Sequence, residues 1–176
     1  MPLTRIRVPL GFVIGVFVLY LATPSLRSIV TGLPLALFGL LFRGVAAGVI
    51  RKDHSLAVCG PYQISRNPLY FGSFLIAVGF SVMSRNLICA ALLLIPFTII
   101  YSIVIRQEES HLWDKFGKEY QQFKNEVPRF FPRRFSFLLF KSFSTRQYVS
   151  NREYNAAFGF AAASAVLVVK YLLESR

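Results

Sequence analysis

Three long runs of the chain carry no charged residue, and they cover residues 8–26, 67–84 and 86–105. An α-helix rises 1.5 Å per residue, so runs of this length span about 27–30 Å, which is the thickness of the hydrocarbon core of a bilayer. The pattern therefore predicts three transmembrane helices.

Two further apolar runs are each interrupted by one basic residue. Residues 33–50 contain Arg43, and residues 154–173 contain Lys170 near their end. A lysine near a helix end can extend its ammonium group to the interface, whereas a guanidinium in mid-span needs a partner or a polar cavity. We expect both runs to be membrane helices, which makes the fold an all-α polytopic membrane bundle of about five transmembrane helices.

The charges between these runs gather on alternate loops. Arg27 and Arg85 fall on one side, and most other loop charges fall on the opposite side. Because Lys and Arg are enriched in cytoplasmic loops, the heavily charged side is predicted to be cytoplasmic. We expect residues 51–68 and 106–143 to form a cytoplasmic cap over the bundle.

The composition agrees with a membrane protein. Hydrophobic residues make up 55% of the 176 residues and charged residues 16%, whereas soluble domains have about 25% charged residues. The net charge of +12 suits loops that face anionic lipid, so we expect membrane lipids and no nucleic acid as partners. Cys59 and Cys89 are too few and too far apart to indicate a disulfide framework or a metal site.

Polar residues at the ends of the predicted helices are the candidates for chemistry. Gly60-Pro61 is a turn dipeptide, and Asn67-Pro68 opens an apolar helix whose free N–H groups attract anions. The paired carboxylates Glu108 and Glu109 follow another apolar run. Each of these patterns alone also fits a plain helix boundary.

Taken in order, several short motifs resemble a known family. The motifs are GLLFRGVAAG at 39–48, His54, GPY at 60–62, RNPLYFG at 66–72, EE at 108–109, FGKEYQQF at 116–123 and VPRFFP at 127–132. Together they resemble the isoprenylcysteine carboxyl methyltransferase-like and phospholipid methyltransferase superfamily of integral membrane enzymes. The resemblance covers residues 33–132 of a single domain spanning 1–176, in which 133–176 add an interfacial segment and the last helix.

The resemblance implies a membrane methyltransferase that uses S-adenosyl-L-methionine. The cofactor contacts that it implies by position are His54, Ser55, Leu56, Ala57, Tyr62, Asn67, Pro68, Leu69, Tyr70 and Glu108. Asn67 stands where the family usually has histidine. Asparagine can donate and accept hydrogen bonds but cannot carry a proton, so we expect a positional role for it.

The resemblance also implies a lipid or prenylated acceptor that enters from the bilayer. Arg106 and Arg43 are candidates to bind this substrate, and Arg106 and Glu109 are candidates for catalysis. Whether a carboxylate or an amine is methylated stays open, as does the oligomeric state. The expected location is the inner membrane of a prokaryote or the endoplasmic reticulum of a eukaryote.

Two other functions remain as alternatives. An NADPH-dependent membrane reductase of the sterol-reductase type carries a segment similar to residues 66–72, although the Glu108-Glu109 pair followed by FGKEY favours the methyltransferase. A non-catalytic membrane scaffold is the other alternative, because Asn67 departs from the family pattern.

Overall fold

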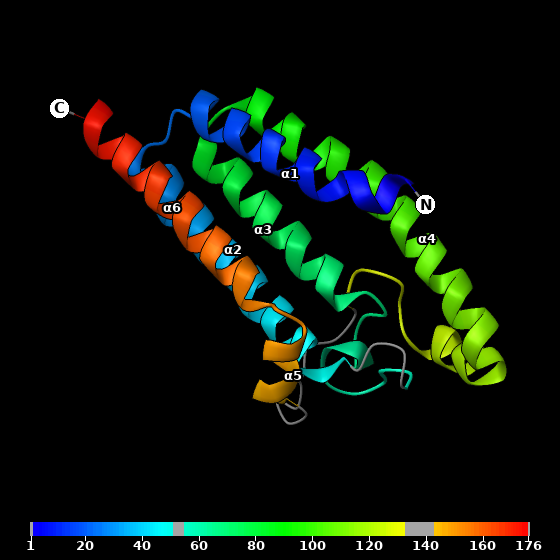
Figure 1. The fold of residues 1–176 in the computed structure, drawn as a ribbon. Helices are drawn as coiled ribbons and strands as arrows, with labels where there is room; N and C mark the ends of the chain where they lie inside the picture. The colour runs from blue at the N-terminus through cyan, green and yellow to red at the C-terminus, as the bar shows by residue number, and fades with distance from the viewer. Residues whose placement is uncertain (1, 51–54, 133–142, 176) are drawn as a thin grey trace.

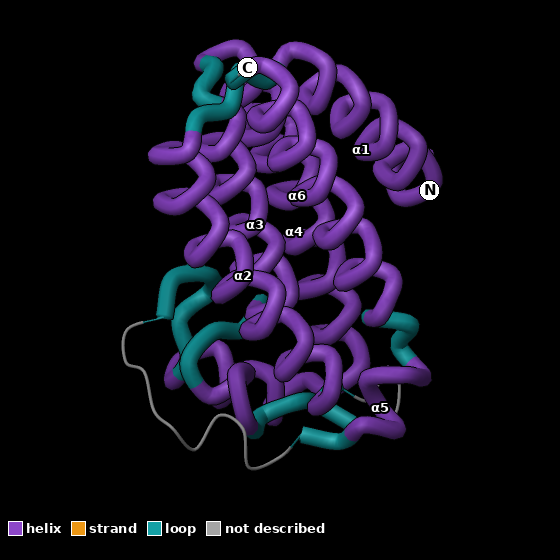
Figure 2. The backbone as a smooth tube through the Cα atoms, turned by 90° about the vertical axis from the view of Figure 1, so that its left-hand side faces the viewer, coloured by secondary structure: helices purple, strands orange, loops and turns teal. Residues whose placement is uncertain are grey.

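The computed structural model describes residues 2–50, 55–132 and 143–175. In these ranges the chain is helical without strands (Figure 1), and the helices are α1 (Pro2–Leu21), α2 (Leu26–Val49), η1 (Gly60–Gln63), α3 (Pro68–Ser84), α4 (Leu87–Glu126), α5 (Thr145–Ser150) and α6 (Tyr154–Glu174). The long helices lie roughly side by side, and the longer loops and α5 gather at one end, which we call the polar end, whereas short turns lie at the other end (Figure 2). The predicted all-α membrane bundle is confirmed.

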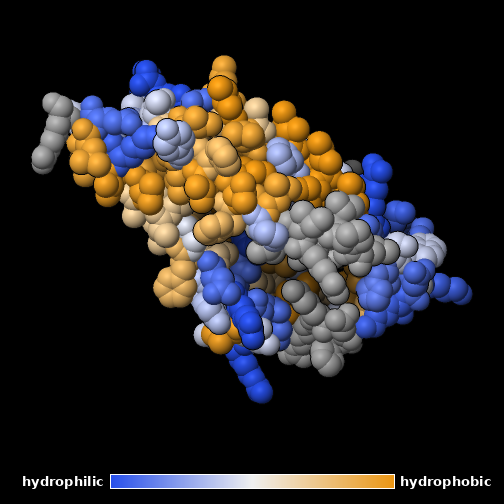
Figure 3. Space-filling model, turned by 45° about the horizontal axis from the view of Figure 1, so that its top comes forward, coloured by the Kyte–Doolittle hydropathy of each residue, from blue (hydrophilic) through white to orange (hydrophobic). Residues whose placement is uncertain are grey.

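Three helices are long and apolar enough to cross a membrane by length and composition, namely α2, α4 and α6. The apolar parts of α1 (Pro9–Leu21) and α3 (Pro68–Ser84) are shorter. Hydrophobic side chains cover most of the bundle's visible face, and hydrophilic ones gather toward its two ends (Figure 3). The chain is therefore an integral membrane protein, and its five long helices overlap the five predicted runs.

The second membrane helix begins earlier than predicted, at Leu26 instead of residue 33. Ser25 and Ser28 form a capping box there, since each backbone N–H donates to the other's hydroxyl, at 2.9 and 3.2 Å. The box satisfies N–H groups that a helix start leaves unpaired. Arg27 consequently lies in the first turn of α2 and not in a loop.

α4 continues well beyond residue 105, where its apolar run ends, and reaches Glu126. Gly117 breaks its regular geometry with φ 47° and ψ −114°, and the last turns fold back toward the bundle (Figure 1). Tyr120 and Phe123 thereby pack with Tyr62 and Leu56 in a buried cluster. Residues 51–54 and 133–142 of the predicted cap lie outside the described residues.

α2 and α3 approach closely through glycines. A Cβ atom on Gly39 would lie 2.6 Å from the carbonyl oxygen of Gly72, and one on Gly79 would lie 2.5 Å from the Cβ of Ala36. Small residues at a helix interface let two backbones come together in this way. The contact fixes the start of α3 beside the last turns of α2, where the candidate site lies.

Candidate functional site

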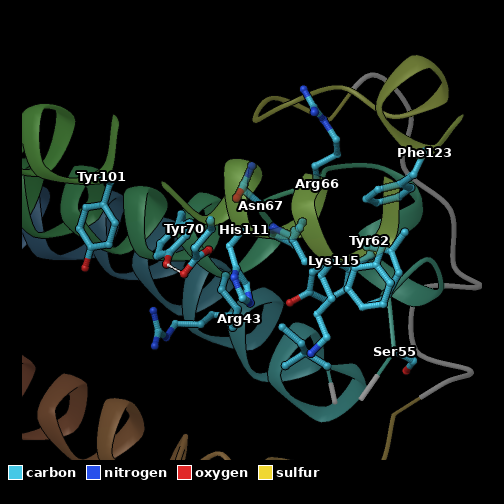
Figure 4. Close-up of a pocket in the computed structure, with 18 of the residues that line it drawn as sticks. Arg43, Ser55, Tyr62, Arg66, Asn67, Tyr70, Tyr101, His111, Lys115 and Phe123 are labelled. Carbon is cyan, nitrogen blue, oxygen red and sulfur yellow. Dashed lines mark hydrogen bonds between the residues drawn. The ribbon is translucent and has the colours of Figure 1, made fainter. Parts of the chain in front are cut away.

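A cavity of about 580 Å³ lies at the polar end, between the last turns of α2, η1, the start of α3 and α4 (Figure 4). Its lining contains nine of the ten residues predicted to contact a cofactor: Ser55, Leu56, Ala57, Tyr62, Asn67, Pro68, Leu69, Tyr70 and Glu108. The tenth, His54, lies outside the described residues. Segments far apart in the sequence thus meet at one cavity, while their binding role stays a prediction.

One face of α4 supplies further lining residues. Tyr101, Glu108, His111 and Lys115 follow one another at spacings of seven, three and four residues, which places them on one side of a helix. Tyr101, His111 and Lys115 were not among the site residues predicted from the sequence. The continuous helix through residue 105 brings them together, and this helical spacing is the signal that could have identified them.

Glu108 faces the cavity and is held by a tyrosine. The Tyr70 hydroxyl donates a hydrogen bond to the Glu108 carboxylate at 2.5 Å (Figure 4). The Tyr70 ring also packs against Tyr101 from α4, with 4.9 Å between ring centroids. These contacts orient a carboxylate and two aromatic rings toward the same space.

Tyr62 is almost completely buried in η1, the turn predicted at Gly60-Pro61. Burial raises the pKa of its hydroxyl above the ordinary value, and the nearby negative charge of Glu108 raises this pKa further. The group therefore stays protonated at physiological pH, and it can donate a hydrogen bond but not act as a base.

Asn67 lines the cavity, but its amide is already engaged. It donates to the backbone carbonyl oxygen of Arg129 at 2.9 Å. The neighbouring Ser65 hydroxyl donates to the carbonyl of Phe130 at 2.8 Å, and the Arg66 backbone N–H donates to that of Pro128 at 2.9 Å. Three hydrogen bonds thus connect the residues before α3 to the segment that follows α4.

Glu109 supports this same junction. Its carboxylate pairs with Arg66 at 3.1 Å and with Arg129 at 2.7 Å. It does not line the cavity, and neither does Arg106, which lies about 160° around the helix axis from Glu108 at 100° per residue. Their roles as candidates for catalysis and, for Arg106, for substrate binding stay predictions.

Arg43 has both a partner and a polar cavity. It lines the cavity, and its guanidinium donates to Ser73 on α3 and through two nitrogens to the carboxylate of Glu153, with 3.2 Å between Nη2 and Oε2. The Arg43 side chain is 26% exposed and that of Glu153 is 7% exposed. Glu153 was not identified from the sequence, because it lies 110 residues from Arg43.

Among the described residues, no group of three His, Cys, Asp or Glu side chains is placed to hold a metal ion. The lining residues are instead apolar residues, aromatic rings, one carboxylate and several cations, including Arg43 and Lys115. Such a lining suits an organic ligand that carries both charges and an aromatic ring system.

Known proteins similar to this chain include metal-resistance proteins and isoprenylcysteine methyltransferases. The nickel-cobalt-cadmium resistance protein NccN of Alcaligenes xylosoxydans xylosoxydans is 38% identical over 95 residues, covering 54% of this chain and 43% of that protein. Protein-S-isoprenylcysteine O-methyltransferase of Schizosaccharomyces pombe is 32% identical, covering 53% and 40% of the two chains. The human protein of that name is 32% identical, covering 62% and 44%. The chain thus matches less than half the length of each of these relatives.

No solved structure matches the chain significantly. The phospholipid methyltransferase family matches residues 40–119, which include most of the cavity lining. This match and the two methyltransferase relatives support the resemblance to the isoprenylcysteine carboxyl methyltransferase-like and phospholipid methyltransferase superfamily that the motifs predict.

Proposed function

We propose that the chain binds S-adenosyl-L-methionine in the cavity and transfers its methyl group to a lipid-like acceptor at the cytoplasmic face of the membrane. The observation that carries the proposal is the meeting of the 55–70 and 101–116 segments at one cavity. The family match over residues 40–119 and the names of the isoprenylcysteine methyltransferases support the reaction type.

The residues present fit this cofactor. The cavity's volume of about 580 Å³ is within the range of about 300–1,000 Å³ that small-molecule pockets occupy. The Glu108 carboxylate can accept hydrogen bonds from ribose hydroxyls, and the rings of Tyr62 and Tyr70 offer faces for an adenine or a sulfonium. Lys115 is a cation that can pair with an α-carboxylate. When bound, the cofactor supplies an electrophilic methyl group on a positively charged sulfur.

The protein's own contribution to such a reaction is alignment and exclusion of water. The Tyr70 hydroxyl donates a hydrogen bond that orients Glu108. Phe123 and Tyr120, on the folded-back end of α4, pack against Tyr62. Placing two reactants in contact in a dry site lowers the barrier to a direct displacement without a covalent enzyme intermediate. The described lining therefore needs no nucleophile of its own.

Calorimetric titration of the purified full chain tests the proposal. S-adenosyl-L-methionine and its demethylated product should both bind with one-to-one stoichiometry, and NADPH should not. NADPH binding alone would favour a reductase, and no binding of any of the three ligands would favour a scaffold. Glu108→Gln should weaken cofactor binding, while Asp114→Asn, on an exposed and non-lining part of α4, should leave it unchanged.

A further inference from the structure

Residues 127–132, which follow α4, return to the start of α3 (Figure 1, yellow). There the rings of Phe130 and Phe131 meet Phe71 and Phe74 of α3 edge to face, with 5.8 to 6.2 Å between ring centroids. Phe130 is half-buried in this contact, but Phe131 is 65% exposed. The described residues therefore leave one large apolar ring uncovered beside the start of a membrane helix.

The length of α3 places this ring at the edge of the bilayer's hydrocarbon core. α3 has 17 residues and no charged side chain, so it is about 25 Å long, whereas the core is about 30 Å thick. A helix this short has its first turns at or inside the boundary of the core. Phe74 lies six residues after Pro68, about 9 Å along the axis, and Phe131 packs against it there. An exposed ring at this depth faces lipid and not bulk water.

The aromatic contacts continue from this segment onto a second membrane helix. Phe74 also packs against Phe97 of α4, with 5.9 Å between ring centroids. Phe97 lies within the charge-free run 86–105, and α4 is long and apolar enough to cross a membrane. The exposed ring of Phe131 is therefore continuous with the apolar surface of the bundle, which the bilayer covers.

The polar side of the same segment supports the wall of the cavity. The backbone carbonyls of residues 128–130 accept hydrogen bonds from residues 65–67 at 2.8 to 2.9 Å. Arg66 and Asn67 in this set line the cavity. The segment thus has an aromatic side toward α3 and lipid, and a backbone that is bonded to the cavity wall. A contact that holds Phe131 in place consequently also holds this wall.

We propose that the surrounding bilayer is the partner that holds this segment. Phe131 inserts at the boundary between acyl chains and headgroups and keeps residues 127–132 against the start of α3. Insertion removes an apolar ring from water, and an aromatic residue in this boundary is a common anchor of interfacial segments. The bilayer thereby contributes to the shape of the cavity, in addition to solvating the helices. The contact does not depend on methyl transfer.

The single native tryptophan gives a matched reference for a fluorescence test. Trp113 is 46% exposed on α4 and lies eight residues, about 12 Å, beyond residue 105, where the charge-free run ends. Phe131→Trp combined with Trp113→Phe moves the only tryptophan to the proposed contact. In nanodiscs of phosphatidylcholine brominated on the upper part of its acyl chains, this variant should lose half or more of its emission. The native protein should keep nearly all of its emission and should instead be quenched by iodide in the water.

Hydrogen exchange of the Arg66 backbone N–H, which donates to the Pro128 carbonyl at 2.9 Å, tests whether lipid holds the wall. In nanodiscs of short-chain phosphatidylcholine the boundary withdraws from Phe131, so this N–H should exchange several-fold faster than in long-chain nanodiscs. Phe131→Ser should exchange fast in both bilayers. Phe12→Ser, which removes a 76% exposed ring on α1, is the matched control and should behave as the native protein. A ring that acts only through protein contacts would respond equally in both bilayers.

Iodide quenching of the Phe131→Trp variant without quenching by brominated lipid would overturn the proposal, because the ring would then lie in water. Quenching by neither reagent would place the ring against a second protein surface and would overturn it equally. Exchange at Arg66 that is the same in both bilayers, or that Phe131→Ser leaves unchanged, would refute the claim that lipid holds the segment. None of these readouts uses a cofactor, so each outcome is independent of the proposed methyl transfer.

Discussion

The side-chain amide of Asn67 donates a hydrogen bond to the backbone carbonyl oxygen of Arg129 at 2.9 Å. This contact links the residue that precedes α3 to the segment that follows α4, across 62 positions of the chain. The contact is compatible with the positional role that we predict for an asparagine where the family usually has histidine, and this role stays a prediction. The amide connects two segments beside the cavity through this hydrogen bond, whereas a histidine there could carry a proton.

Asn67→Ala should lower the free energy of unfolding by about 0.5–1.5 kcal/mol, because one neutral hydrogen bond in a buried position is lost. Thermal or denaturant unfolding in detergent measures the change. Asn125→Ala, at an exposed position in the last turn of α4, is the control and should be neutral. Equal stability of all three proteins would show that the contact with Arg129 contributes nothing measurable.

Substitution of Glu108 should affect cofactor binding, whereas substitution of Glu109 should affect stability. Glu108→Gln should weaken S-adenosyl-L-methionine binding by about 1.5–3 kcal/mol, the usual contribution of a hydrogen bond to a charged group. Glu109→Gln should mainly lower the melting temperature, because it removes the ion pairs with Arg66 and Arg129. Calorimetric binding and thermal unfolding of the two variants, measured side by side, separate these effects. Equal, near-native affinities in both would remove Glu108 from the proposed binding site.

Gly117→Ala should destabilise the fold-back of α4. The backbone there has φ 47° and ψ −114°, a conformation that costs a residue with a Cβ about 1–3 kcal/mol. Unfolding measurements should show this loss, with weaker cofactor binding if Phe123 leaves the cavity. Gly15→Ala is the matched control, since Gly15 lies in regular helix with open space around it and should gain slightly in stability. Identical behaviour of the two variants would argue against a strained turn at Gly117.

Glu153→Gln should destabilise the protein, because it leaves the Arg43 guanidinium without its carboxylate partner. We expect a loss of up to about 3 kcal/mol, the lower end of the range for buried ion pairs, since Arg43 is 26% exposed. The double variant Arg43→Gln with Glu153→Gln should recover part of this loss, and a double-mutant cycle measures the coupling. Strictly additive losses would mean that the pair is not coupled.

The topology predicts which engineered cysteines are accessible from each side of the membrane. Cysteines placed at Arg27 and Arg85 should react from the side opposite to those placed at Lys118 and Lys124. Impermeant thiol reagents on sealed vesicles, with the native Cys59 and Cys89 replaced by serine, give the readout. Labelling of all four positions from one side contradicts the arrangement.

The sequence was sufficient to locate the helices, since long charge-free runs have few explanations besides a membrane span. It misplaced the start of α2 because the capping serines Ser25 and Ser28 lie within a short polar stretch that resembles a loop. It also did not locate the close contact between α2 and α3, which Gly39 and Gly72 make. The spacing of two glycines does not show which face of a helix meets another.

The candidate site was predictable where one short segment supplies several residues, as with Tyr62 and the stretch from Asn67 to Tyr70. The orientation of the residues on α4 was not predictable without the exact course of the helix, and Arg106 and Glu109 consequently point elsewhere. The partner of Arg43 was also not predictable, because Glu153 reaches it only after the chain has passed through α5. Long-range tertiary contacts of this kind leave no local pattern.

Methyl transfer itself is the most direct test of the proposed function. The purified chain, reconstituted in vesicles that contain phosphatidylethanolamine, would be incubated with S-adenosyl-L-methionine labelled with tritium in the methyl group. The account predicts that label appears in the organic phase as methylated lipid, that Glu108→Gln greatly reduces it, and that Asp114→Asn does not. Absence of transferred label from phosphatidylethanolamine and from a farnesylcysteine acceptor alike, in a protein shown to be folded, would contradict the account.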